Sequence, residues 1–586
     1  MNAERMLALY DRVSDAPDAV ARLRRFVLDL AVRGKLVEQD PEDEHASVLL
    51  ERIAAEKARL VQAGKMKKPK VSATIDPSEL PINVPSHWTW SRLCDIGRLS
   101  GGMTPSKSNS EYWNGNVVWV SPKDIKTDEV RGSELKITDA GLRETRLELY
   151  PEGSLFIVAR SGILKRTFPV SINRVPAASN QDLKVLVPFL KGQEQYLQIM
   201  FRGMTDFLLA RLVKQGTTVQ SLRYAEFAVQ PFPLPPLAEQ HRIVARVEEL
   251  MALLDRLEAA RDVREATRDR LTVASLVRLT APDTTAEDIT AHASFALDAL
   301  PVITTDTDQV KLLRQTILSL AVQGKLTEQD SADEPASELL KRLRTAQKSA
   351  FTAEGLRQRK AVHRLSRSEL WFTFPPSWEL SCFDDLFVVA SGVTKGGRVS
   401  ADLAIELPYL RVANVQRGHL DLTVVKKIVI KKSNEERYRL RDGDILMTEG
   451  GDWDKLGRAA IWRDEISGCI HQNHVFRVRP PSQEIRPEWV VVYVNSKIGR
   501  RFFEEASKQT TNLASINMTQ LRSCPLLLPP LAEQHRIVAK VDALMALCDR
   551  LDSVLRNADA TRARLLDTLL HEALSPAALD ARKTAA

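Results

Sequence analysis

A short run of acidic and basic side chains between residues 124 and 136 has the residue types that nucleases use to hold Mg²⁺. Asp124 or Asp128 precedes Glu134 and Lys136 in a D…E-x-K pattern. Carboxylate oxygens are the ligands that Mg²⁺ prefers. The pattern is short, arises often by chance and has no counterpart in the other half of the chain. We therefore expect a charged surface strand here, with a self-contained Mg²⁺-dependent endonuclease as the alternative.

The stretch 471–474, His-Gln-Asn-His, places two imidazoles near one another. Two imidazoles alone do not complete a tetrahedral site, so we expect no metal site here, and amide and imidazole side chains at a loop or strand start are at least as suited to reading bases. The five cysteines are widely spaced without a C-x-x-C pair, which fits neither a zinc ribbon nor a disulfide framework. Glycine-rich nucleotide-binding patterns and the Asn-Pro-Pro-aromatic motif of amino-methyltransferases are missing. The sequence predicts no catalytic residues and no cofactor in this chain.

The elements that must position any functional side chains are built twice. Residues 234–257, LPPLAEQHRIVARVEELMALLDRL, recur as 528–551, LPPLAEQHRIVAKVDALMALCDRL, at an offset of 528 − 234 = 294. Each copy enters through a Pro-Pro corner and continues as a long amphipathic helix. Its apolar side chains alternate in steps of four and three, which is typical of a coiled coil. We expect the two helices to pair through Ile243, Val247, Leu250, Leu254 and Leu257 in the first copy and Ile537, Val541, Leu544, Cys548 and Leu551 in the second.

A second repeat lies ahead of each β-rich segment. LAVRGKLVEQD at 30–40 matches LAVQGKLTEQD at 320–330 at nine of eleven positions. We expect Gly34 and Gly324 to end their helices as C-caps rather than to bind phosphate. Trp88 aligns with Trp378 at the same offset, 378 − 88 = 290. The helical parts keep their sequence while the two β-rich segments differ, which indicates a constant scaffold that carries two different heads.

These repeats divide the chain into an α+β multidomain protein with an internal pseudo-two-fold duplication. The order of helical block, β-rich domain and long helix occurs twice. The expected parts are a helical block (1–65), a basic linker (66–80), a first β-rich domain (81–234), a first long helix (235–280), a linker (281–305), a second helical block (306–370), a second β-rich domain (371–528) and a second long helix (529–586).

The composition is that of an ordinary protein with a mild basic excess. The chain carries 83 Lys+Arg against 76 Asp+Glu, and its pI is near 9.0, which permits nucleic-acid binding without requiring it. The N-terminal stretch contains acids and no long apolar core, and no apolar run approaches ~20 residues. We expect neither export nor membrane insertion, and therefore a cytoplasmic location.

The duplicated PPLAEQHRIVA, the AVQGKL stretch and the two divergent β-rich domains resemble the specificity subunit of a Type I restriction-modification enzyme. The resemblance covers nearly the whole chain. Further matching motifs are GGMTPS (101–106), VVWVSPKDI (117–125), LPYLRVANVQRGHL (407–420) and LRDGDILMT (440–448). The helical block before the first β-rich domain departs from the plainest family members, so its role stays open.

The resemblance implies a non-catalytic subunit that reads double-stranded DNA. Each β-rich domain would be a target recognition domain, and the two long helices would pack antiparallel as a spacer. Two different heads would read an asymmetric bipartite target, with half-sites separated by roughly one helical turn, ~34 Å. The family's partners are two modification subunits, which methylate adenine with S-adenosylmethionine, and two restriction subunits, which use ATP and Mg²⁺ in defence against phage.

Donor-rich side chains on expected loops and strand ends are the candidates for DNA contact, because base edges and phosphates require such groups. For each of them, an ordinary surface role is an equal alternative. A helical scaffold that binds only proteins is the remaining alternative for the whole chain. The DNA candidates are Thr104, Lys107, Ser121, Lys123, Arg160, Ser161, Asn180 and Gln181 in the first domain, and Arg411, Asn414, Gln416, Asp452, Lys455, Gln472, Asn473, Thr510, Thr511 and Asn512 in the second.

Overall fold

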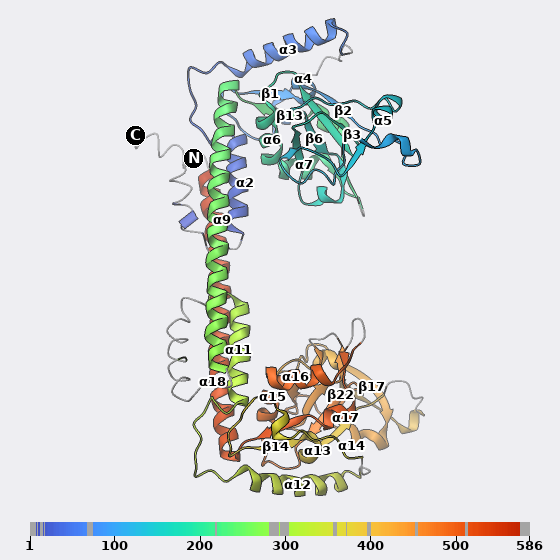
Figure 1. Ribbon diagram of the computed structural model, residues 1–586, viewed down its shortest axis with the longest axis vertical. Coiled ribbons are helices and arrows are strands. Elements are labelled where there is room, and N and C mark those ends of the chain that lie inside the picture. Colours follow the sequence, from blue (N-terminus) through green and yellow to red (C-terminus); the bar gives the residue numbers. More distant parts are fainter. Residues whose placement is uncertain are drawn as a thin grey trace. The chain divides into compact units, whose positions relative to one another are not determined.

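The computed structural model describes residues 8, 10, 11, 14, 16, 18–66, 74–216, 219–280, 292, 304–355, 360–370, 372–394, 400–451, 455–509 and 514–574. The chain divides into two compact units, Met1–Val263 with Asp559–Ala586, and Arg264–Ala558. The boundary falls inside both long helices, α9 (Leu237–Thr280) and α18 (Leu531–Leu574), so each unit contains part of each helix (Figure 1). Within the described part of the chain, no helix is long and apolar enough to span a membrane.

The first unit contains a β-rich head and two helices that precede it. A five-stranded sheet in the order β2-β10-β6-β8-β4 forms the centre of the head, and two three-stranded sheets, β5-β3-β9 and β11-β12-β7, adjoin it. The elements are α2 (Ala19–Val32), α3 (Ala46–Gln62), β1 (Thr89–Arg92), α4 (Leu93–Ile96), β2 (Gly97–Gly101), β3 (Trp113–Val120), β4 (Glu129–Val130), β5 (Leu135–Ile137), α5 (Asp139–Glu144), β6 (Leu155–Val158), β7 (Arg160–Ser161), β8 (Val170–Asn173), β9 (Ala177–Ser179), β10 (Leu183–Pro188), α6 (Glu194–Gly203), α7 (Thr205–Leu212), β11 (Val213–Lys214), β12 (Gln220–Leu222), α8 (Tyr224–Val229) and β13 (Pro231–Leu234).

The second unit repeats this plan. Its central sheet has the order β15-β22-β18-β20, and the sheets β17-β16-β21 and β19-β24-β23 adjoin it. The elements are α11 (Thr307–Val322), α12 (Ala336–Ala353), β14 (Glu379–Cys382), α13 (Phe383–Leu386), β15 (Val388–Ser391), β16 (Ala404–Leu410), β17 (Lys426–Lys431), α14 (Glu435–Tyr438), β18 (Ile445–Thr448), β19 (Gly450–Gly451), β20 (Ala459–Ile461), β21 (Ile470–His471), β22 (Val475–Arg479), α15 (Pro487–Asn495), α16 (Lys497–Ala506), β23 (Lys508–Gln509), β24 (Ala514–Ser515), α17 (Met518–Arg522) and β25 (Pro525–Leu528).

The strands β1 and β13 pair in the first unit, and β14 and β25 pair in the second, so each head is closed by the segments that enter and leave it. The strand that leaves the head leads directly into the long helix. The expected α+β architecture, with two β-rich domains joined to two long helices, is therefore confirmed.

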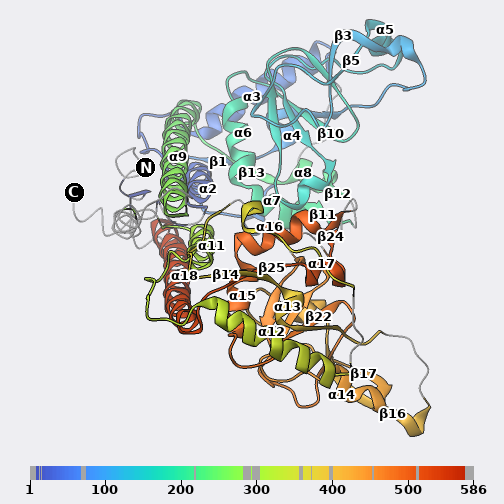
Figure 2. The same ribbon diagram turned by 60° about the horizontal axis from the view of Figure 1, so that its bottom comes forward.

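The two long helices run antiparallel, as expected. In the first unit, α2 binds the first half of α9 through Arg24 and Asp255, 2.6 Å apart, and the last part of α18 through Arg22 and Asp567. In the second unit, α11 binds the first half of α18 through Arg314 and the last part of α9 through Gln309. Figure 2 shows α2 beside α9, in agreement with these contacts.

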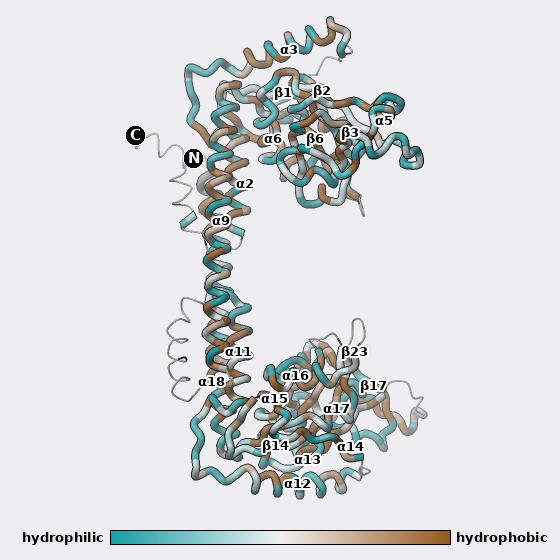
Figure 3. The backbone as a smooth tube through the Cα atoms, in the orientation of Figure 1, coloured by the Kyte–Doolittle hydropathy of each residue, from teal (hydrophilic) through white to brown (hydrophobic). Residues whose placement is uncertain are grey.

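The predicted pairing of the two apolar seams with each other is corrected by the core contacts. Ile243, Val247, Leu250 and Leu254 lie in the core of the first unit, with α2 and the first head, and Leu257 packs against this core. Ile537, Val541 and Cys548 lie in the core of the second unit, and Leu544 and Leu551 pack against it. The physical reason is direction: the N-terminal halves of antiparallel helices lie at opposite ends of the pair. Figure 3 shows hydrophobic and hydrophilic residues alternating along α9. This is the pattern of a helix that packs one apolar stripe against a core and has polar residues on its other face.

The repeated sequence motifs build the same buried junction in both units. Glu239, at the start of α9, accepts the indole N–H of Trp88 at 2.8 Å and an amide N–H of Gln39 at 2.8 Å. Glu533, at the start of α18, accepts the same two bonds from Trp378 and Gln329. Both carboxylates are buried, and Glu and Trp in each junction come from motifs repeated in sequence. The motifs are therefore conserved between the halves because they lock helical block, head and long helix together.

One further ion pair completes each junction. Arg242 pairs with Asp43 in the first unit, and Arg536 pairs with Asp333 at 2.6 Å in the second. Gly34 and Gly324 end α2 and α11 with φ of 65° and 69°, which confirms the predicted C-caps. At Gly34 a Cβ atom would lie 2.5 Å from Cγ of Pro85, so the glycine also permits close approach of the chain that enters the head.

Candidate nucleic-acid interface

The polar candidates of the first head gather along one edge. Strands β3 and β9 run parallel, with Val120 opposite Ser179, so the residues that follow both strands emerge at the same side. The backbone N–H of Asn180 donates to the carbonyl of Val120 at 2.9 Å. The hydroxyl of Thr104 donates to Oε1 of Gln181 at 2.5 Å. Three chain segments, near residues 104, 121 and 181, therefore meet at this edge.

A fourth segment of the first head joins the same edge. The backbone N–H of Arg160 donates to the carbonyl of Asp182 at 3.1 Å. Strand β7 also pairs with β12, where Arg160 lies opposite Ser221. The side chain of Arg160 is exposed. Lys107 and Lys123 are exposed on the adjoining loops. The structure thus assembles the predicted residues of the first head from segments far apart in sequence.

The second head builds its edge in the same way from different side chains. Strands β16 and β21 run parallel, and Gln472 donates its backbone N–H to the carbonyl of Leu410 at 2.9 Å, as Asn180 does to Val120. The antiparallel pairing of β7 with β12 recurs as β19 with β24. Gln472 and Asn473 are partly exposed at this edge. The two edges are therefore structural equivalents.

This equivalence assigns two predicted residues to a structural role. Oδ2 of Asp124 accepts the backbone N–H of Ser121 at 2.8 Å, and Oδ1 of Asn414 accepts that of Arg411 at 2.9 Å. Each side chain closes the turn after the strand that leads to the edge. Asn414 is 3% exposed, and its amide also donates to two backbone carbonyls. Asn414 is therefore occupied inside its loop and is not available to bases.

The other candidates differ in their exposure and in whether their polar groups already form hydrogen bonds within the protein. Asn180 is buried, and its Oδ1 accepts the backbone N–H of Asp182 at 3.0 Å. Gln416 accepts a bond from Arg458 at 2.6 Å. Arg411 and Lys455 are partly exposed. Asp452, Thr510, Thr511 and Asn512 lie outside the described residues.

The structure gives His474, one of the two imidazoles singled out in the sequence, a partner at the second edge that the sequence did not predict. Nδ1 of His474 contacts a carboxylate oxygen of Glu449, and both side chains are partly or largely exposed. The backbone N–H of Glu449 donates to the carbonyl of His474 at 3.0 Å, which places the pair at the position equivalent to Ala159 and Asp182 in the first head. Residues 449 and 474 are far apart in sequence, so only strand pairing reveals the pair.

His471 does not belong to a metal site. Its Nδ1 lies 2.7 Å from the carbonyl of Val475, and the side chain is fully buried. Burial lowers the pKa of His471 to about 3, so the imidazole is neutral. No group of three or more His, Cys, Asp or Glu residues within the described ranges could hold a metal ion.

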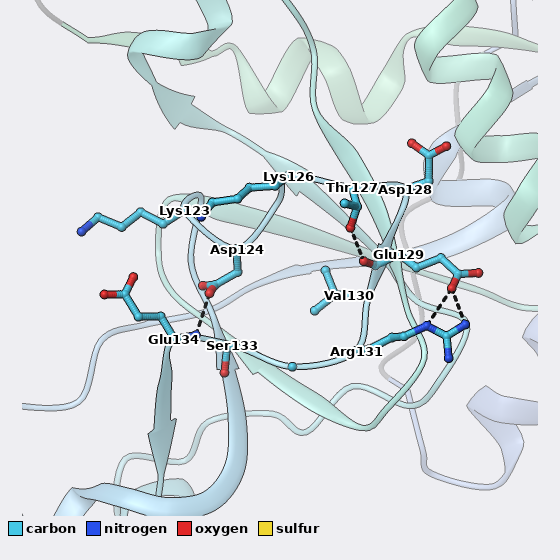
Figure 4. Close-up of a pocket in the computed structure, with 11 residues that line it drawn as sticks. Lys123, Asp124, Lys126, Thr127, Asp128, Glu129, Val130, Arg131, Ser133 and Glu134 are labelled. Atoms are coloured by element: carbon cyan, nitrogen blue, oxygen red, sulfur yellow. Dashed lines mark hydrogen bonds and ion pairs between the residues drawn. The ribbon is translucent and has the colours of Figure 1, made fainter. Parts of the chain in front are cut away.

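The three carboxylates of the nuclease-like pattern, but not Lys136, line an open hollow on the loop 123–134 (Figure 4). Oδ1 of Asp124 accepts the backbone N–H of Glu134 at 2.8 Å. Asp128 instead pairs with Arg202 at 2.6 Å. The exposed side chain of Glu134 points away from Asp128 in Figure 4. The carboxylates thus organise the loop and the surface, and they do not converge on a common ion.

These observations define a class: a two-headed protein that presents one polar edge on each head. Residues 85–263 and 375–558 match the family described as the Type I restriction modification DNA specificity domain. The matched segments cover more than half of the chain, and the chain belongs to this family. It is a Type I specificity subunit with a role in recognising DNA sequence.

Specificity subunits from Escherichia coli are similar to nearly the whole chain. The chain is 28% identical over 572 residues to the specificity subunit of the Type I restriction enzyme EcoEI from Escherichia coli, covering 95% of this chain and 94% of that one. It is 28% identical over 567 residues to the EcoAI specificity subunit from Escherichia coli, with the same coverage of both chains. The solved HsdS subunit from Thermoanaerobacter tengcongensis is 19% identical, with a TM-score of 0.39 over 85% of this chain and 98% of that one.

Proposed function

We propose that the two edges read the two halves of an asymmetric bipartite DNA target. The observation that carries this proposal is the repetition of one backbone arrangement on two sets of side chains. Equivalent backbone geometry suits two similar approaches to duplex DNA, and different side chains suit different base sequences. Thr104, Gln181, Arg160, Gln472 and Asn473 are the best-placed candidates for contact with bases.

The long helices serve as spacer and docking surface in this proposal. Each has 44 residues, or about 66 Å at 1.5 Å per residue. We infer that they bind two modification subunits, which methylate adenine with S-adenosylmethionine, and that two restriction subunits using ATP and Mg²⁺ join the complex. The specificity subunit itself is non-catalytic and has no cofactor of its own. The complex acts in the cytoplasm, where the chromosome lies.

The experiment that tests the proposal exchanges one head. Residues 81–234 are replaced by the corresponding head of another family member, and N6-methyladenine is mapped across the genome of cells that express the chimaera with the modification subunit. We expect one half-site to change and the other to stay. The matched control exchanges 371–528 and should change the opposite half. A change in both halves after a single exchange contradicts independent reading.

The two alternatives predict different results. A self-contained endonuclease should cut DNA with Mg²⁺ alone and lose that activity in Glu134→Ala, whereas the divergent carboxylates of the 123–134 loop favour no cleavage. A scaffold that binds only proteins should show no sequence-dependent retention of DNA, even with the modification subunit present. Methylation at a mapped target sequence would exclude the hypothesis of a scaffold that binds only proteins.

A further inference from the structure

A basic groove lies in the first unit between α2, two loops of the head and the last turns of α18. Six cationic side chains line it: Arg22, Arg24, Arg25, Lys126, Arg166 and Arg202. Its loops, 125–128 and 163–171, directly follow the edge residues Lys123 and Ser161 in sequence. The two loops of the groove are therefore adjacent in sequence to residues of the DNA-reading edge.

Half of these cations are committed to carboxylates of the protein. Arg22 pairs with Asp567, Arg24 pairs with Glu258 at 2.7 Å, and Arg202 pairs with Asp128 at 2.6 Å. The first two pairs join α2 to the long helices, and the third joins α6 to the loop 125–128 of the head.

The other three cations are exposed and uncommitted. Arg25, Lys126 and Arg166 are exposed, and none of them forms an ion pair with the residues that the structure describes. Asp206 also lines the groove, so the three cations exceed the remaining carboxylate by two positive charges, and this excess favours binding of an anion. Thr167 adds an exposed hydroxyl group to the same wall, which suits hydrogen bonding to a phosphate oxygen.

The second unit carries no counterpart of two of these charges. The helical blocks correspond at an offset of 290, so Arg25 (25 + 290 = 315) matches Gln315. The turns closed by Asp124 and Asn414 correspond at the same offset, so Lys126 (126 + 290 = 416) matches Gln416. These two charges are thus a property of the first unit and not of the repeated scaffold.

We propose that this groove holds the sugar-phosphate backbone of the duplex beside the half-site read by the first head. The proposal rests on the proposed function and extends it in two ways. It gives the helical block ahead of the first head a DNA-binding role through Arg25, and it makes the electrostatic contribution of the two heads unequal. Contacts to phosphate fix the position of the duplex and carry no base preference.

The test replaces the three charges in the full-length chain by glutamine, as Arg25→Gln, Lys126→Gln and Arg166→Gln together. Binding is measured over a salt series with two labelled duplexes of equal length, one with the mapped target and one with a scrambled sequence. Each lost phosphate contact should reduce the slope of log K against log salt by about 0.9, or about 2.7 for three. Raising salt from about 50 to about 200 mM should then weaken the original protein about 40-fold more than the variant.

A matched control removes three charges from another part of the same head. Lys136, Arg143 and Arg146 are exposed on and beside β5 and α5, which lie on the side of the head away from α2 in Figures 1 and 2. Their glutamine variants should keep the salt slope. The ratio of target to scrambled affinity should be unchanged in the groove variant. Thermal unfolding of both variants should match the original protein, because the groove cations form no ion pairs within the described structure.

The outcomes separate the groove from the reading edges. If the groove and control variants lose the same slope, or if neither loses any, the proposal is overturned while the DNA-reading function stands. Unchanged DNA binding together with weakened association with the modification subunit also overturns it, in favour of a protein partner. If the original chain shows no preference for the target duplex, even with its modification subunit, the proposed function itself fails.

Discussion

Replacement of Trp378 by Phe should destabilise the second unit through a single buried hydrogen bond. The indole N–H of Trp378 donates to Oε2 of Glu533 at 2.8 Å, and Glu533 is 1% exposed. Phe keeps an aromatic ring in the core but leaves the carboxylate with one donor fewer. A hydrogen bond to a charged group contributes about 1.5–3 kcal/mol. We expect a loss of about 2 kcal/mol in the free energy of unfolding at neutral pH, in addition to the loss of packing.

Trp489 provides a matched control in the same core. It is fully buried and packs edge-on against Trp378, with ring centroids 5.4 Å apart. Its indole N–H donates to the neutral carbonyl of Leu527 at 2.9 Å. Trp489→Phe removes the same atoms as Trp378→Phe, but the lost bond to a neutral acceptor contributes only about 1 kcal/mol. The difference between the variants therefore isolates the buried charge.

The pH dependence of the two variants should also differ. Burial raises the pKa of Glu533, while its hydrogen bonds from Trp378 and Gln329 lower it. A carboxyl whose folded pKa exceeds its unfolded value stabilises the fold less as pH rises through that window. Loss of the Trp378 donor raises the pKa further. The Trp378→Phe deficit should be complete at neutral pH and shrink on acidification, while the Trp489→Phe deficit should stay constant.

Urea unfolding followed by circular dichroism, at about pH 7.5 and about pH 5, measures these differences. A double-mutant cycle with Glu533→Gln isolates the interaction, because Gln keeps an acceptor oxygen without charge. In the Glu533→Gln background, Trp378→Phe should cost about 1 kcal/mol less than in the original protein. Equal costs in both backgrounds, together with a deficit that does not shrink in acid, would refute the assignment of Glu533 as a buried charged acceptor.

Three further predictions concern other parts of the chain. Acidification from pH 6.5 to about 5 should lower the free energy of unfolding of the second unit by about 2 kcal/mol, because the unfolded chain protonates His471 while the folded state, with a pKa of about 3, does not. Urea unfolding of the His471→Gln variant should show that this pH dependence of stability is lost. Leu250→Pro should cost about 3 kcal/mol or more and weaken assembly with the modification subunit, as measured by helicity and gel filtration, while Leu250→Ala, which keeps the helix, should preserve assembly. Glu449→Gln should alter binding at the second half-site only, measured with duplexes changed in one half. The unfolding temperature should change little, because His474 is largely exposed and Glu449 partly exposed.

Much of the scaffold could be predicted from the sequence because its signals are local. The repeats at offsets of 290 and 294 gave the order of parts, and glycine after an apolar periodic stretch gave the helix ends at Gly34 and Gly324. The alignment of Trp88 with Trp378 pointed to equivalent positions, and both indoles donate to equivalent carboxylates. The absence of nucleotide-binding motifs is likewise a property of the sequence alone.

The candidate interface was only partly predictable. Residue type placed Thr104, Gln181, Gln472 and Asn473 among the candidates, and the structure brings them to strand ends at equivalent edges. The same reasoning chose Asn414, whose amide closes its own loop. An amide on a loop has the same local signal whether it faces DNA or a backbone carbonyl, so residue type cannot separate the two roles.

The sequence by itself determined that one scaffold occurs twice and carries two unlike heads. The tertiary structure decided which surfaces of these parts contact one another. The apolar seams of α9 and α18 face α2 and α11 because helix direction, which periodicity does not encode, sets the partner of each seam. The reading edges, the Glu449–His474 pair and the groove at Arg25 depend on residues distant in sequence, and only strand pairing and core packing bring such residues together.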